Sequence, residues 1–125
     1  MNRTFPSIKY PKLVYVAGRF RSSHAGDQFE QTMNILAAMQ IALDVWKMGA
    51  VALCPHGNTF CFQGTMDDSV WLEGSLLLLE RCDAVMCVPN WTRSEGAKLE
   101  IKYAEELGKP VFYSFTELGK WLRDE

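Results

Sequence analysis

Short apolar runs rich in β-branched residues alternate with longer helix-like segments along the chain, and this alternation constrains the fold most strongly. Three of the four runs stop at a glycine or a proline. Buried parallel strands have such continuous apolar runs, and parallel neighbours are joined through crossover connections that are usually helical. The predicted strands span residues 13–17, 50–54, 84–88 and 111–113. We therefore predict a three-layer α/β fold, flavodoxin- or Rossmann-like, with a parallel sheet of about four to five strands flanked by helices.

Helix start and stop signals separate these runs. Asp27, with Glu30 three residues later, resembles a capping box and predicts a helix that reaches Met48. Its predicted buried face consists of Ile35, Met39, Ala42 and Trp46. The other predicted helices run from Asp68 to about Arg81, from Ser94 to Gly108 and from Thr116 to Arg123, with Asp68 and Ser94 as N-caps.

Composition limits the class of protein. The 125 residues suit a single domain, which we assign to residues 1–125 with its core at about 13–115. A net charge of −2 argues against a generally basic nucleic-acid binder, and the longest aliphatic run, Leu76–Leu79, is far too short for a membrane span. Without an apolar secretory segment at its start, the chain is expected in the cytoplasm, bound neither to nucleic acid nor to a membrane.

Neither a metal nor a cofactor is expected. Cys54, His56 and Cys61 lie close in sequence, but Cys82 and Cys87 do not form the close second pair that structural zinc normally uses. Buried or pocket-lining thiols are the favoured interpretation. The chain has neither a P-loop nor a complete GxGxxG motif, which argues against ATP chemistry and dinucleotide binding.

Glu100 stands out on the helix that begins at Ser94. At about 100° per residue, it falls within the apolar arc formed by Ala97, Ile101, Ala104 and Leu107. A carboxylate on the buried side of a helix needs a partner, because burying an unpaired charge is costly. The residues leave two interpretations open: a functional carboxylate at the ligand-binding edge of the sheet, or a structural hydrogen bond to Tyr15 or to the backbone.

Four segments together resemble the nucleoside 2-deoxyribosyltransferase superfamily, closest to a small bacterial and phage branch whose members mostly lack an assigned activity. They are YVAG at 15–18, CPHGNT at 54–59, CDAV at 82–85 and SEGAKLE at 94–100. The resemblance runs from about Leu13 to Phe115. It implies that Glu100 is the nucleophile that attacks the anomeric carbon of a 2-deoxyribosyl group, and that the Tyr15 hydroxyl orients it. The alternative interpretation of Tyr15, slightly less favoured given the match, is an ordinary strand aromatic.

The resemblance also suggests where the sugar and its 5′ end bind. Family members that act on free nucleosides tend to have aspartate at the position of Ser94, whereas a serine and helix amino-terminal amides accept a phosphate. Arg21 matches an arginine of the related nucleotide N-hydrolases, and Arg19 replaces a common proline. With Gly18 and Gly96, these residues form the expected sugar-phosphate cradle. The alternative is that Ser94 only caps its helix and that the arginines are solvated.

One departure from the family concerns the leaving base. Ser75 stands where the family has an aspartate that helps to protonate or position this base, and a serine is not an acid near neutral pH. His56 and Asn58 are candidates to contact a base or phosphate, or to stabilise their loop. Trp91 is a candidate to stack on a base or to pack against a second subunit.

These observations lead to two main functional hypotheses. The first is a hydrolase or transferase that acts on the N-glycosidic bond of a 2-deoxyribonucleoside or its 5′-monophosphate. The second is a binding module that retains the pocket but is impaired at Ser75, and a more remote third is an NAD-type ribosyl hydrolase, by analogy of fold. The resemblance further implies a homodimer or larger homo-oligomer as the assembled form.

Overall fold

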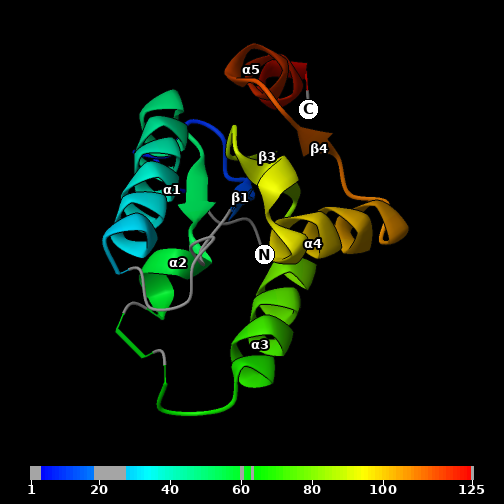
Figure 1. Ribbon diagram of the computed structural model, residues 1–125. Coiled ribbons are helices and arrows are strands. Elements are labelled where there is room, and N and C mark those ends of the chain that lie inside the picture. Colours follow the sequence, from blue (N-terminus) through cyan, green and yellow to red (C-terminus); the bar gives the residue numbers. More distant parts are fainter. Residues whose placement is uncertain (1–3, 19–27, 60, 63, 125) are drawn as a thin grey trace.

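The computed structural model describes residues 4–18, 28–59, 61–62 and 64–124, and it has the predicted α/β architecture (Figure 1). Four parallel strands form one sheet in the order β2-β1-β3-β4, which places β1 between its two neighbours. Tyr15 in β1 is in register with Leu53 in β2 and with Val85 in β3. The strands are β1 (Leu13–Ala17), β2 (Val51–Leu53), β3 (Ala84–Cys87) and β4 (Val111–Phe112).

Helical segments connect the strands and flank the sheet. They are α1 (Gln28–Met48), α2 (Pro55–Asn58), α3 (Asp68–Glu80), the 3₁₀ turn η1 (Trp91–Arg93), α4 (Glu95–Glu106) and α5 (Phe115–Asp124). The short helix α2 falls in a segment that the sequence predicted as loop; Pro55 occupies its first turn, where the missing N–H costs nothing. Within the described ranges, no helix is long and apolar enough to cross a membrane.

The two faces of the sheet carry separate parts of the core. Alternate residues of a strand point to opposite faces, so Tyr15 packs with Leu79 and Ile101 on the side of α3 and α4. Val14 packs with Val45 and Leu118 on the side of α1 and α5. The sheet is therefore covered on both sides, as the three-layer prediction requires.

The buried face of α1 differs from the prediction. Ile35 and Ala42 are buried as expected, but Met39 and Trp46 are each 47% exposed, and Ala38 and Val45 take the positions against the sheet. Apolar residues surround most of this helix, so the sequence pattern did not single out one stripe. The small side chain of Ala38 suits a close approach between helix and sheet.

The ends of α3 and α4 also differ from the predictions. Asp67, not Asp68, caps α3, because its carboxylate accepts a hydrogen bond from the Ser69 N–H. Leu107 is exposed because it follows the last helical residue of α4 and lies beyond the buried arc. Asp27 lies outside the described residues.

Gly18, directly after β1, packs so closely against a neighbouring side chain that no Cβ atom fits at this position. A Cβ atom at this position would lie 2.5 Å from Cγ2 of Val88, a buried side chain at the end of β3. Since both residues directly follow the central strands β1 and β3, this contact determines how closely the two chain segments approach each other where they leave the sheet.

We predict that Gly18→Ala lowers the free energy of unfolding by about 1–3 kcal/mol through overpacking. Urea denaturation will measure the loss, and adding Val88→Ala should partly restore stability. Gly74→Ala in α3 is the matched control: among the described residues, nothing lies within 4 Å of the point that its Cβ would occupy. Alanine should stabilise that helix by about 0.5–1 kcal/mol. Equal stability of Gly18→Ala and wild type would contradict this account.

Candidate functional site

Tyr15 and Glu100 form a buried hydrogen-bonded pair at the centre of the molecule. The phenol of Tyr15 donates to Oε2 of Glu100, joining β1 to α4. Tyr15 is fully buried and Glu100 is only 7% exposed. The buried arc of α4 that the sequence predicted, Ala97, Glu100, Ile101 and Ala104, is confirmed. The hydrogen bond between the two residues is also present, and it serves both interpretations of Glu100.

Burial dominates the electrostatics of this pair. Desolvation raises the pKa of Glu100 from its ordinary value of 4.5 to about 7, and the Tyr15 hydrogen bond offsets only part of that rise. Burial also raises the pKa of Tyr15, and the neighbouring Glu100 carboxylate raises it further. Near neutral pH, Glu100 is therefore divided between an ionised form that is a nucleophile and a protonated form that is an acid.

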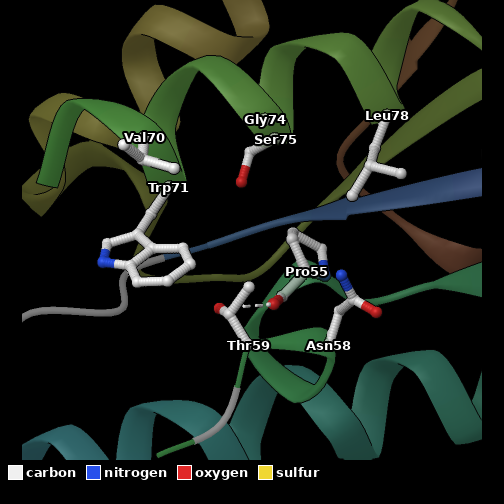
Figure 2. A pocket seen from close by; sticks show the side chains of 8 residues that line it. All are labelled: Pro55, Asn58, Thr59, Val70, Trp71, Gly74, Ser75 and Leu78. Carbon is white, nitrogen blue, oxygen red and sulfur yellow. Dashed lines mark hydrogen bonds between the residues drawn. The ribbon is translucent and has the colours of Figure 1, made fainter. Parts of the chain in front are cut away.

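Ser75 connects this pair to a cavity between α2 and α3. Its hydroxyl is close enough to hydrogen-bond the phenol of Tyr15, which lowers the pKa of that phenol. Ser75 also lines a cavity of about 300 Å³, and Figure 2 shows its side-chain oxygen directed from α3 toward the space above α2. The cavity is lined by Pro55, Asn58, Thr59, Val70, Trp71, Gly74, Ser75 and Leu78.

Trp71 is a cavity residue that the sequence pattern did not indicate. Its indole ring faces the cavity from α3, one helical turn before Ser75 (Figure 2). The centroid of the Phe62 ring lies 6.1 Å from that of the indole. Among the described residues, the buried indole nitrogen has no hydrogen-bond partner. The sequence feature that could have identified Trp71 is its spacing from Ser75. Residues four apart share a helix face, so Trp71 lies on the same face as Ser75, and Gly74 on the same face as Leu78.

His56, in α2, connects the segments that follow β1 and β2. Its Nε2 lies 3.1 Å from the carbonyl oxygen of Gly18, and the imidazole is 5% exposed. Because a carbonyl oxygen only accepts, Nε2 carries the proton in this contact. This contact is one that the loop-stabilising interpretation of His56 predicts, and Asn58 from the same helix lines the cavity.

Ser94 caps α4, as predicted. Its Oγ accepts a hydrogen bond from the Ala97 N–H at 3.0 Å, and Gly96, in the first turn, is exposed. The other notable aromatic residue, Trp91, lies against Tyr113, with ring centroids 5.4 Å apart, and does not line the cavity. Arg19 and Arg21 lie outside the described residues.

Asp83, from the CDAV segment, has a structural role that the sequence analysis did not assign. Its carboxylate accepts a hydrogen bond from the Leu13 N–H at 2.8 Å, and its own N–H donates to the Leu13 carbonyl at 2.7 Å. These two bonds fix the start of β1 beside β3. The placement of Tyr15 two residues later depends on this register.

The cysteines form no disulfide. All four are free; burial raises the pKa of Cys82 to about 11 and that of Cys87 to about 12, so both are neutral thiols at physiological pH. Glu100 adds to the rise at Cys87, which places this thiol near the buried carboxylate. Among the residues that the structure describes, no group of three His, Cys, Asp or Glu side chains is arranged to hold a metal ion.

Comparison with known proteins gives a family but no activity. The family model of a domain of unknown function, DUF4406, matches residues 12–113, so the chain belongs to this family. This range contains all four strands and the Tyr15–Glu100 pair. No curated protein matches the chain.

The raised pKa of Glu100 predicts how stability depends on pH. Between pH 4.5 and about 7 the folded protein holds a proton that the unfolded chain has lost. The free energy of unfolding therefore falls as pH rises through this window, by on the order of 3 kcal/mol. Urea denaturation from pH 4.5 to 8 will measure this slope. Glu100→Gln should remove it, and Glu106→Gln, an exposed control on the same helix, should not. An unchanged slope in Glu100→Gln would refute the assignment.

Proposed function

We propose that this member of the DUF4406 family cleaves the N-glycosidic bond of a 2-deoxyribonucleoside or its 5′-monophosphate, as a hydrolase or a base transferase. The observation that carries the proposal is the buried carboxylate of Glu100, oriented by the Tyr15 hydroxyl beside a cavity. The resemblance of YVAG and SEGAKLE to the nucleoside 2-deoxyribosyltransferase superfamily supports it, because Tyr15 and Glu100 are the residues that resemblance selects.

The chemistry follows from the charge of the transition state. An ionised Glu100 oxygen attacks the anomeric carbon while the bond to the base breaks, and the bonding electrons leave with the base, which takes up a proton. The sugar is cationic in this transition state, so an adjacent carboxylate stabilises it and can trap it as an ester. Water then displaces Glu100 and gives the free sugar, or a second base does so and gives a new nucleoside.

The cavity between α2 and α3 is the proposed site for the base. Its volume of about 300 Å³ is at the lower end of small-molecule sites, and its lining is mostly apolar with few polar groups. Trp71 offers a ring face for stacking, and Asn58 and Ser75 offer hydrogen-bonding groups. Ser75 lies between this cavity and the phenol of Tyr15, and the bond to be broken is placed on that side.

The sugar and its 5′ end are assigned to the other side of Glu100, at the amino terminus of α4. Ser94 and Gly96 lie in that first turn, and a helix amino terminus favours an anion such as phosphate. Gly18 follows β1 directly, and Arg19 and Arg21, which come next in the sequence, complete the proposed cradle. A serine at position 94 avoids the repulsion that an aspartate would exert on a 5′-phosphate.

A binding module is the second candidate, and Ser75 is the observation that favours it. A serine hydroxyl does not protonate a departing base near neutral pH, so the pocket would hold a nucleotide without turning it over. Chromatography of nucleosides and deoxynucleotides incubated with the protein separates the candidates, since only the enzyme releases free base. An NAD-type ribosyl substrate would instead release nicotinamide.

We also propose a cytoplasmic location. The four free cysteines support it, because reducing compartments keep thiols unpaired. In this proposal the ligand is a small nucleoside or nucleotide, and no cofactor takes part.

Glu100→Gln tests the proposed reaction directly. It should reduce base release by more than about 10³-fold while ligand binding, measured as a thermal shift, persists, because the amide keeps the shape of the side chain but is no nucleophile. Glu106→Gln, the exposed control on α4, should retain activity. Base release by Glu100→Gln at the wild-type rate would contradict the nucleophile assignment.

Ser75→Asp tests whether the protein lacks a general acid for the leaving base. A carboxyl group at this position would lie near Glu100, and two close carboxyls can share a proton, which raises one pKa toward that of a useful acid. We expect base release to increase by at least roughly tenfold. Ser75→Asn, of similar shape but without an ionisable proton, should give no gain. A fully active native protein, with Ser75→Asp neutral or harmful, would show that the leaving base is activated elsewhere.

A further inference from the structure

The outer face of α1 carries a continuous row of exposed apolar side chains. In Figure 1 this helix lies at one edge of the molecule. By sequence position, the row follows its length in steps of three and four residues. Its members and their exposed fractions are Phe29 (76%), Met33 (50%), Leu36 (52%), Met39 (47%), Leu43 (47%) and Trp46 (47%). Two of its members, Met39 and Trp46, were predicted to be buried. We call these six residues the α1 row.

The same face is almost without charge. Eleven residues of α1 are exposed, and Lys47 is the only charged one among them. A helix face that meets water normally carries several charges. Aromatic and methionine side chains without charge are instead the composition of the core of a protein–protein interface.

The α1 row reads nearly the same from either end of the helix. An aromatic residue stands at each end, Phe29 and Trp46, and aliphatic or methionine residues lie between them. If two copies of α1 pack antiparallel, Phe29 of each copy meets Trp46 of the other, and the middle of the row meets itself. Such self-complementarity is the requirement for a twofold interface.

The charge in the last turn of the helix fits the same arrangement. Lys47 lies on the same face as the α1 row, so parallel packing would place the two Lys47 ammonium groups together, whereas antiparallel packing places them at opposite ends of the helix pair. The opposed helix dipoles also favour the antiparallel orientation.

The area available is appropriate for a dimer. A fully buried aromatic side chain removes 150–250 Å² from water, so the exposed parts of Phe29 and Trp46 contribute about 250 Å². This is roughly a third of the ~800 Å² per partner that a standard interface buries. Four further apolar side chains, along a helix about 30 Å long, add to it.

We propose that the α1 row is a twofold docking surface for a second copy of this chain, with the two α1 helices antiparallel. The α1 helix covers the face of the sheet opposite α3 and α4, so the docked copy leaves the Tyr15–Glu100 pair undisturbed. The proposal therefore does not depend on the chemistry proposed for Glu100. It goes beyond the expectation of a homo-oligomer by assigning the surface and its orientation.

Light scattering after gel filtration tests the surface. The wild-type chain should be a dimer at micromolar concentration, and Leu36→Glu combined with Leu43→Glu should be a monomer with an unchanged circular dichroism spectrum. Leu77→Glu is the matched control, since Leu77 in α3 is 53% exposed and Leu36 is 52% exposed; it should remain a dimer. A monomeric wild type, a dimeric double variant, or a monomeric Leu77→Glu overturns the proposal.

Disulfide cross-linking tests the orientation. In the antiparallel arrangement Met33 of one copy lies beside Leu43 of the other, whereas positions 33 and 43 of one helix are about 15 Å apart, too far for a disulfide within one chain. Under mild oxidation, the double variant Met33→Cys with Leu43→Cys should therefore give a covalent dimer in which peptide mapping finds position 33 joined to position 43. Links that join 33 to 33 and 43 to 43 overturn the antiparallel arrangement.

Discussion

The hydrogen bond between Tyr15 and Glu100 is the contact on which the interior of this protein depends. It joins the central strand to α4 and supplies a polar partner for a carboxyl group enclosed by apolar neighbours. Without that phenol the carboxyl would be left unsatisfied in the core, at a cost of about 1–3 kcal/mol. The same burial that requires the partner also brings the pKa of Glu100 to about 7, within the range of acid–base chemistry.

The segments that follow the central strands meet around this pair. The missing side chain of Gly18 lets the chain pass close to Val88, and His56 from the β2 side holds the Gly18 carbonyl. From α3, the Ser75 hydroxyl is within hydrogen-bonding reach of the Tyr15 phenol, and the same residue lines the cavity. In a parallel sheet the carboxyl ends of the strands lie along one edge, so residues distant in sequence converge there.

Local sequence patterns succeeded where one face of an element differs clearly from the other. Glu100 was found because it interrupts an apolar arc, and Ser94 because it precedes a helix with the spacing of a cap. The pattern failed on α1, where apolar residues occur on nearly every side and the interaction with the sheet selected Ala38 and Val45 over Met39 and Trp46. Trp71 was missed because its spacing from Ser75 shows only that the two share a helix face, while the other wall of the cavity comes from α2.

The sequence by itself determined the alternation of strands and helices, the parallel sheet and the burial of Glu100, since these follow from short-range periodicity and capping. Only the tertiary structure decided what Glu100 meets and which face of α1 is left in water. Those outcomes depend on strand order and helix packing, which bring together residues as far apart as Tyr15 and Glu100, 85 positions along the chain. Periodicity shows that a side chain is buried, but its partner is determined by which elements become neighbours in space.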